Sequence, residues 1–246
     1  MDEELILDFF DRNLITGVVG ELKAGKEAQV FVCRADPHTG HGLLAAKVYR
    51  PREQRAFRSE AAYLEGRSSL MRGRARASSA TRAIERRSRA GRAILSATWV
   101  RREYDVLRRL RQAGVQVPEP FAYAEHAVLM QYLGDELQSA PRLVAASLTL
   151  EEAGSFRARL LQDVERLLRE GLIHGDLSPY NVLVFEGKPW IIDLPQAVDA
   201  AVHMDAQGLL RRDIVNLTRH FTRYGFADDG AVHADRLWED FRRGRI

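Results

Sequence analysis

Four polar residues in one short segment have the types and spacing that phosphoryl transfer requires. The segment Leu172–Asp193 contains His174, Asp176, Asn181 and Asp193. Transfer of a terminal phosphoryl group needs a carboxylate near the attacking hydroxyl group, and it needs oxygen ligands that hold Mg²⁺ against the phosphates. Asp176 fits the first role, and Asn181 and Asp193 fit the second. The set therefore predicts a phosphoryl-transfer site, although any one member alone is more typical of a turn or a helix cap.

A predicted β-hairpin separates the two candidate metal ligands. The apolar run VLVF follows Asn181, the run WII precedes Asp193, and Glu-Gly-Lys-Pro lies between the runs. This pattern indicates two short buried strands joined by a turn, which would bring Asn181 close to Asp193. The order of His-x-Asp, Asn and apolar-apolar-Asp matches the spacing of the protein-kinase catalytic signature. The third part differs, because Asp193-Leu194-Pro195 stands where that signature has Asp-Phe-Gly.

A lysine inside an apolar run indicates a second part of the site. Lys47 lies in LLAAKVY, where burial of an unpaired ammonium group would be costly. We predict Glu103 as its partner, because this acid adjoins an apolar stripe at helical spacing, formed by Trp99, Val100, Tyr104, Leu107 and Leu110. Asp105 is the competing acid, but it lies on the other side of that helix. The alternative for Lys47 is a strand-edge ammonium group that reaches water.

A glycine turn precedes the lysine run. Residues 22–30 read LKAGKEAQV and lie between two apolar runs, which predicts a strand, a turn and a strand. Gly25 would let backbone N–H groups in this turn approach phosphates. Lys26 would add a phosphate contact or would simply be solvated. The turn matches neither G-x-G-x-x-G nor G-x-x-x-x-G-K-[ST], the two glycine motifs that bind phosphates. Taken alone, it is therefore an ordinary hairpin.

Seven motifs, taken together and in order, resemble the RIO family of atypical protein kinases. They read GKEAQVF, LAAKVYR, TWVRREYDVL, VPEPFA, HAVLMQYLG, LIHGDLSPYNVLV and IIDLPQAVD, and the resemblance runs from about residue 18 to residue 223. The resemblance implies an α+β, bilobal, protein-kinase-like fold of the trimmed RIO type. Residues 1–130 would form an N-terminal lobe with an antiparallel sheet and a helix. Residues 131–246 would form a mostly helical catalytic lobe, and the two lobes together would make one RIO kinase domain.

The resemblance also implies roles for individual residues. ATP would be bound with Mg²⁺, for which Mn²⁺ can substitute, and Asp176 would be the catalytic aspartate. Asn181 and Asp193 would bind the metal, and Asp193 would accept phosphate in those family members that form an aspartyl-phosphate. The remaining nucleotide-binding residues would be Gly25, Lys26, Glu27 and Ala28 in the glycine turn, Lys47 with Glu103, and Met130, Gln131 and Tyr132 at the adenine hinge. Other family members phosphorylate themselves on serine.

Two other functions remain open from the sequence. The HGDL motif with Pro179 three residues after Asp176 also resembles small-molecule phosphotransferases, such as aminoglycoside and choline kinases. Gly175 and Pro195 are further departures from the common RIO pattern, although none removes a needed carboxylate, amide or ammonium group. The second alternative is a nucleotide-sensing, ribosome-associated assembly factor with little turnover. The physiological protein substrate is not named by any motif.

Composition excludes several classes of protein. The chain has 246 residues, 46% of them hydrophobic, and a formal net charge of +3. No window of eighteen uninterrupted apolar residues occurs, so we expect no membrane span. The acidic start is unlike a secretory signal, and we expect a cytoplasmic protein. Cys33 is the one cysteine, which excludes an internal disulfide and a cysteine zinc site.

Arginine is concentrated in one segment. Between Gly66 and Arg92 there are nine arginines and one acid, with serines interleaved and no aromatic residue. We predict a flexible basic insertion over about residues 66–96. Three roles compete: a phosphoacceptor loop, a weak contact with RNA or the ribosome, and a solvated linker. Without aromatic residues to stack bases, generic attraction to RNA is favoured over specific recognition.

The remaining periodicities place the predicted elements. We expect a leading helix over residues 1–13, three strands within 18–49 and two more within 121–130, giving a five-stranded sheet. Helices are expected over residues 98–113, 149–170, 205–224 and 229–242. Thr149 with Glu152 predicts a capping box, and Gly171 predicts the end of that helix. Asp213 is expected either to cap N–H groups of the Asp176 loop or to form an exposed ion pair with arginine.

Overall fold

The chain folds into two compact units. The computed structural model describes residues 5–25, 28–49, 89–136, 138–227 and 229–246. One unit, here the sheet unit, comprises Met1–Arg108 and Glu119–Tyr132, and the other, the helical unit, comprises Arg109–Pro118 and Leu133–Ile246. By compactness the chain thus divides after Tyr132. The lobe boundary predicted between residues 130 and 131 remains a prediction.

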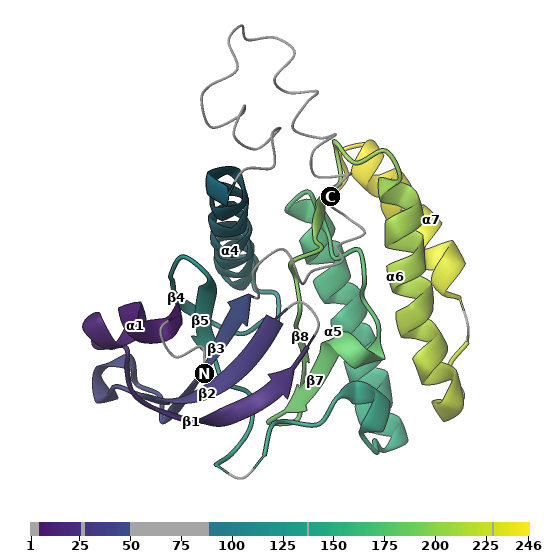
Figure 1. Ribbon diagram of the computed structural model, residues 1–246. Helices are drawn as coiled ribbons and strands as arrows, with labels where there is room; N and C mark the ends of the chain where they lie inside the picture. Colours follow the sequence, from purple (N-terminus) through teal and green to yellow (C-terminus); the bar gives the residue numbers. More distant parts are fainter. Residues whose placement is uncertain (1–4, 26–27, 50–88, 137, 228) are drawn as a thin grey trace, which may run out of the picture. The chain divides into compact units, whose positions relative to one another are not determined.

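A five-stranded antiparallel sheet forms most of the sheet unit (Figure 1), as the sequence predicts. Its order is β1-β2-β3-β5-β4, so β5 lies between β3 and β4. The β1 strand carries three register irregularities against β2, and the other neighbouring pairs are more regular. The strands are β1 (Ile15–Ala24), β2 (Ala28–Ala35), β3 (Leu43–Tyr49), β4 (Pro120–Tyr123) and β5 (Ala127–Gln131).

The register of the sheet separates two kinds of side chain onto its two faces. Phe31 lies opposite Ala46, which lies opposite Leu129, and these residues belong to a buried cluster with α1. Because successive side chains in a strand alternate between faces, the neighbouring positions point the other way. Those positions include Lys47, which lies opposite Val30 on β2. The register therefore places Lys47 on the face away from the α1 cluster.

The leading helix is shorter than predicted. Residues 1–4 lie outside the described part, and α1 spans only Leu7–Asp11. Ile6 and Phe9 are fully buried and fix this helix against the sheet. The chain leaves the helix at Asn13, whose φ of 52° is left-handed, and Leu14 N–H bonds back to Phe9. This reversal, which asparagine tolerates well, lets β1 begin at Ile15.

The helix that carries Glu103 is longer than predicted. It is α4 (Arg89–Gln112), so it begins nine residues before the expected start at Thr98. Its first residues therefore occupy the end of the segment for which we expected a flexible insertion, and residues 50–88 lie outside the described part. Its C-terminal end is a Schellman motif: Gly114 has a φ of 77°, its N–H bonds to Arg111, and Val115 N–H bonds to Leu110.

Three helices form the bulk of the helical unit: α5 (Leu150–Arg169), α6 (Ala206–Phe221) and α7 (Gly230–Arg242) (Figure 1). The predicted capping box is confirmed, because Thr149 and Glu152 each bond the other's backbone N–H. Helix α6 packs against both α5 and α7. In the described part of the chain, no helix has both the length and the apolarity that a membrane span requires.

Two short pairs of strands complete the helical unit. β6 (Leu172–Ile173) pairs with β9 (Val198–Asp199), and β7 (Val182–Phe185) pairs with β8 (Lys188–Ile191). The second pair is the predicted hairpin. Its turn has only two residues, Glu186 and Gly187, and both have positive φ. This is the turn geometry that matches the twist of paired strands, and so Lys188 and Pro189 belong to β8 rather than to the turn.

Candidate active site

Lys47 and Glu103 form a buried ion pair in the sheet unit. Lys47 Nζ lies 2.8 Å from Glu103 Oε1, and the two side chains are only 12% and 2% exposed. The predicted pairing is thus confirmed. Asp105, the competing acid, is exposed and lies 3.7 Å from Arg101 on the same helix. Periodicity along α4 was sufficient to distinguish the two acids.

Tyr49 is a member of this cluster that the sequence analysis missed. Its hydroxyl donates to Glu103 Oε2, so both carboxylate oxygens of Glu103 are bonded. Lys47 Nζ also lies 5.3 Å from the centroid of the Tyr49 ring. The signal was present in the sequence, because residues two apart in a strand share one face. The arrangement fixes the orientation of the carboxylate that holds Lys47.

The glycine turn needs glycine for a steric reason. Gly25 N–H donates to the Ala28 carbonyl over 2.9 Å, and a Cβ at Gly25 would lie only 2.9 Å from that oxygen. The N–H of Gly25 is therefore engaged within the turn. Lys26 and Glu27, which were predicted to contact the nucleotide, lie outside the described residues. Phosphate binding by this turn remains a prediction.

The Lys47 face of the sheet is apolar around the lysine. Val32, Ala45 and Tyr132 form a small cluster there, against which Met130 packs. The register confirms the common face, because Val32 lies opposite Ala45 and Ala45 lies opposite Met130. The predicted hinge residues Met130 and Tyr132 thus belong to the same apolar surface as the strand that carries Lys47.

Asp213 holds the loop that contains Asp176. Its two carboxylate oxygens accept hydrogen bonds from Gly175 N–H at 2.7 Å and from Leu177 N–H at 2.9 Å. The capping role predicted for Asp213 is therefore confirmed, and the ion-pair alternative is not needed. Burial raises the pKa of Asp213, against the opposing effects of His174 and the two N–H donors. Asp213 thus holds both neighbours of Asp176, and the Asp176 side chain is exposed.

Two further contacts shape the same loop. Asp176 N–H donates to His174 Nδ1 at 3.3 Å, so the other ring nitrogen carries the proton and donates to the Ile192 carbonyl at 3.1 Å. His174 thus braces the loop. Arg212 donates to the Gly175 carbonyl, a contact that no sequence spacing indicated. Gly175 has a φ of 82°, and a Cβ there would approach the Gln196 carbonyl to 3.0 Å.

Asp176, Asn181 and the start of the Asp193 segment are connected by short contacts. Asn181 Nδ2 donates to the Asp176 carbonyl at 2.8 Å, and Ile192 N–H donates to the Asn181 carbonyl at 3.0 Å. Asp193 follows Ile192 directly, is exposed, and has a φ of 68°. The hairpin therefore brings these residues together, as the sequence predicted.

The donor set suits a hard cation. Because the Asn181 amide nitrogen is bonded to Asp176, its amide oxygen is the atom that remains to face a metal ion. Carboxylate and amide oxygens are the ligands that Mg²⁺ prefers in proteins. Among the residues described, no group of three or more His, Cys, Asp or Glu side chains is arranged to hold a metal ion. The candidate site offers the Asp193 carboxylate and the Asn181 amide oxygen instead, which fits an ion that also binds phosphates.

Comparisons with known proteins agree with this geometry. The model of the RIO domain matches residues 29–235. Serine/threonine-protein kinase RIO1 of Chaetomium thermophilum is 33% identical over 232 residues, which cover 90% of this chain and 42% of that protein. RIO-type serine/threonine-protein kinase Rio1 of Haloferax volcanii is 33% identical over 220 residues, covering 89% of this chain and 67% of that protein. The chain thus spans less than half of the length of the fungal relative.

Solved structures show the same fold. The Rio2 kinase of Chaetomium thermophilum, in a complex described as ADP/Mg²⁺-phosphoaspartate, matches with a TM-score of 0.64 at 22% identity, covering 99% of this chain and 70% of that one. A second structure of that kinase also matches with a TM-score of 0.64, at 20% identity. The expected α+β, protein-kinase-like fold is confirmed. Together with the match of the domain model over most of the sequence, these findings show that the chain belongs to the RIO domain family.

Proposed function

We propose that this chain binds ATP with Mg²⁺ and transfers the γ-phosphoryl group to serine or threonine residues of proteins, its own included, or to its own Asp193. The observation that carries the proposal is the buried Lys47–Glu103 ion pair. Desolvation largely offsets the attraction within such a pair, so stability alone does not account for it. An ammonium group held at a fixed place on an apolar surface is well suited to orient the phosphates of a nucleotide.

The sheet unit would bind the nucleotide. The apolar surface around Val32, Ala45 and Met130 suits a flat base, and the backbone from Met130 to Tyr132 would bond its edge. Lys47 lies on the same face and would contact the phosphates. Glu103 and Tyr49 keep its ammonium group in place. Nucleotide binding would therefore draw on residues that the sheet already presents together.

The helical unit would perform the transfer. Asn181 and Asp193 would hold Mg²⁺, which neutralises charge on the phosphates when it is bound. Asp176 would orient the acceptor hydroxyl group and take its proton as the new oxygen–phosphorus bond forms and ADP departs. Because Asp213 and His174 fix the backbone around Asp176, its carboxylate would need little reorganisation.

A second route uses Asp193 itself as the acceptor. Its carboxylate would attack the γ-phosphorus, forming an acyl phosphate and releasing ADP, and water would then hydrolyse that bond with Asp176 as the base. The Rio2 kinase structure from Chaetomium thermophilum is described as a complex with phosphoaspartate, which supports this route. In that case the chain would act as an ATPase with a covalent intermediate rather than as a kinase of other proteins.

One labelling experiment tests both routes. The protein is incubated with [γ-³²P]ATP and Mg²⁺, and the label is located by mass spectrometry and by its stability to hydroxylamine, which cleaves acyl phosphates. We expect label on serine or threonine, or a hydroxylamine-sensitive label on Asp193. Asp176→Ala should leave ATP binding intact; it should reduce transfer to serine or threonine about 10³-fold on the first route, and slow the loss of label from Asp193 on the second. Asp105→Ala, which removes an exposed acid on the same helix as Glu103, is the matched control and should change neither transfer nor ATP binding.

Other outcomes would support the alternatives. Full turnover in Asp176→Ala would contradict the role given to that residue. Label on an added amino sugar or choline, with none on protein, would favour a small-molecule phosphotransferase. An absence of label and of free phosphate, with intact nucleotide binding, would favour an assembly factor that senses nucleotides. Contact of the arginine-rich segment with RNA or the ribosome remains a prediction, since most of that segment lies outside the described residues.

A further inference from the structure

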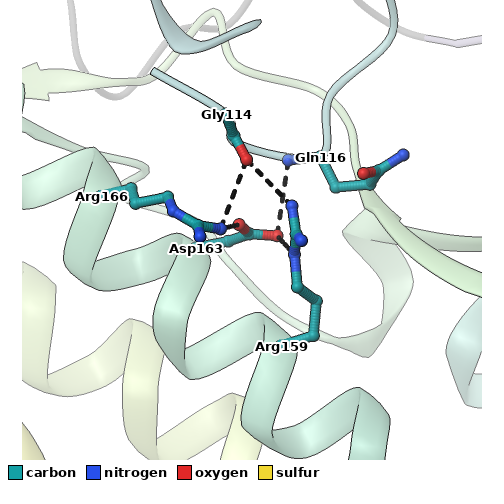
Figure 2. Close-up of polar contacts among 5 residues, drawn as sticks. All are labelled: Gly114, Gln116, Arg159, Asp163 and Arg166. Carbon is teal, nitrogen blue, oxygen red and sulfur yellow. Dashed lines mark hydrogen bonds and ion pairs between the residues drawn. The ribbon is translucent and has the colours of Figure 1, made fainter.

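A buried carboxylate on α5 holds a segment that no motif singled out. Asp163 is fully buried and accepts hydrogen bonds from Arg159 Nε at 2.9 Å and Arg166 Nη1 at 2.8 Å. Figure 2 shows the two arginines on either side of Asp163, both reaching the carbonyl of Gly114. Those contacts measure 2.9 Å from Arg159 and 3.3 Å from Arg166. Gln116 N–H completes the set with a longer contact of 3.4 Å to Asp163.

This cluster differs from an ordinary helix-surface ion pair. Exposed pairs at such spacings contribute about 0.3–0.5 kcal/mol and are screened by salt. Here the carboxylate is removed from water, and the arginine side chains are 34% and 27% exposed. Loss of one partner from a desolvated cluster leaves charge or backbone groups without their bonds. The segment from Gly114 to Gln116 is therefore fixed to α5 at both of its ends.

The same segment is bonded to the hairpin. The backbone carbonyl of Gln116 accepts a hydrogen bond from Ile191 N–H at 2.8 Å, on the edge of β8 that β7 does not occupy. One turn earlier, the guanidinium group of Arg111 lies over the Trp190 ring, 5.6 Å from its centroid. The Gln116 backbone carbonyl thus bonds the open edge of the two-stranded hairpin, as a third strand would. Its position depends on the Asp163 cluster.

The end of β8 leads directly to Asp193. The loop that contains Asp176 holds Ile192. The Ile192 N–H donates to the Asn181 carbonyl, and the Ile192 carbonyl accepts from His174 Nε2. Ile191 is held from the other side by Gln116. Asp193 has a φ of 68°, a left-handed conformation that aspartate adopts more readily than most residues other than glycine. Both sets of contacts therefore fix the backbone from which the Asp193 side chain projects.

We propose that Asp163, together with Arg159 and Arg166, positions the carboxylate of Asp193 for the metal ion. The cluster fixes the Gln116 peptide, this peptide fixes Ile191, and Ile191 fixes the strand end two residues before Asp193. The inference rests on the proposed function, in which Asp193 binds Mg²⁺. Asp163 is a positioning residue in this scheme, because it touches neither substrate nor metal. Loss of a group that orients a metal ligand commonly weakens metal binding by roughly 10- to 100-fold.

The test compares Asp163→Asn with a control on the same helix. Glu165→Gln changes the charge equally, but Glu165 bonds only Arg169 at the exposed surface in the contacts that the structure describes. Hydrogen exchange of the Ile191 amide is measured by NMR, and Mn²⁺ affinity is measured by electron paramagnetic resonance with saturating ADP. In Asp163→Asn we expect about tenfold faster exchange at Ile191 and about tenfold weaker Mn²⁺ binding. Metal-free ADP affinity should be unchanged, and Glu165→Gln should match the wild type in all three measurements.

Each other outcome has a defined meaning. Faster exchange with unchanged Mn²⁺ affinity would overturn the proposal, because Asp163 would then only support the fold. If Asp163→Asn does not fold, Arg166→Met removes one donor to Gly114 and should give a smaller change in the same direction. A wild-type protein that binds no Mn²⁺ would refute the proposed function. The amide signals of Ile191 and Asp193 in the variant would then decide by themselves whether Asp163 positions this segment.

Discussion

Glu103 in the sheet unit and Asp213 in the helical unit are both buried carboxylates, yet they hold their parts of the site differently. Glu103 bonds the charged end of a flexible side chain, Lys47, and a tyrosine hydroxyl group. Asp213 bonds two backbone N–H groups. The first arrangement fixes a group that a ligand can contact, whereas the second fixes the course of the chain. In this pair, the acid that meets an ammonium group within reach of a ligand is suited to binding, and the acid that meets only backbone N–H groups is suited to a scaffold.

The largest effect should come from replacing the ion pair while preserving its volume. In the double variant Lys47→Met/Glu103→Gln, we expect phosphoryl transfer to fall about 10³-fold, because the phosphates lose their fixed cation. The unfolding free energy should change by less than about 1 kcal/mol, since replacing a whole buried pair is often neutral. Steady-state kinetics and urea unfolding measure the two quantities. A loss of several kcal/mol would mean that the pair is a scaffold after all, and the comparison with Asp213 would fail.

Asp213→Ala should show the opposite pattern. Both N–H groups beside Asp176 lose their acceptor, so we expect the unfolding free energy to fall by about 3 kcal/mol. Asp213→Asn keeps the volume and one acceptor oxygen, and it should recover part of that loss. Arg101→Ala, which removes only an exposed 3.7 Å contact, is the control and should stay within about 0.5 kcal/mol of the wild type. Equal stability of Asp213→Ala and the wild type would contradict the scaffold role.

Glu103 and Asp163, the buried carboxylate of the further inference, differ in what the sequence could reveal about them. Glu103 was identified because apolar spacing on α4 distinguishes its face from that of Asp105. Tyr49 carried a comparable signal, its two-residue offset from Lys47, which remained unused. Asp163 carried none: its arginines at helical spacing resemble an ordinary surface network, and only packing of a distant segment buries it. Local periodicity therefore predicts residues that share an element, whereas contacts between distant segments need the fold.

His220 on α6 tests how a buried titratable group behaves with neither kind of partner. Its Nε2 has no hydrogen-bond partner in the described part of the chain, and burial, with a smaller effect of Arg223, lowers its pKa to about 4. The folded pKa lies below the unfolded value, so this contribution to stability is complete above about pH 6.5 and is lost as the pH falls toward 4. Between pH 7 and 5 we expect the wild type to lose about 1–2 kcal/mol more than His220→Gln. Parallel pH profiles from urea unfolding would contradict this expectation.

The smallest effect is expected from Tyr49→Phe. This variant tests whether Glu103 must hold the Lys47 ammonium group in a fixed orientation or need only balance its charge. Tyr49→Phe removes the hydroxyl group that fixes Glu103 and leaves the ion pair and the ring in place. We expect a loss of about 1 kcal/mol in unfolding free energy, the usual contribution of one hydrogen bond. If orientation of the carboxylate matters to the bound phosphates, kcat/KM for ATP should fall about fivefold as well. Tyr123→Phe, which alters a half-exposed ring elsewhere in the sheet unit, is the control. A Tyr49→Phe variant with lower stability and unchanged kcat/KM would show that charge at Lys47 suffices, and that the fixed orientation of Glu103 serves only the fold.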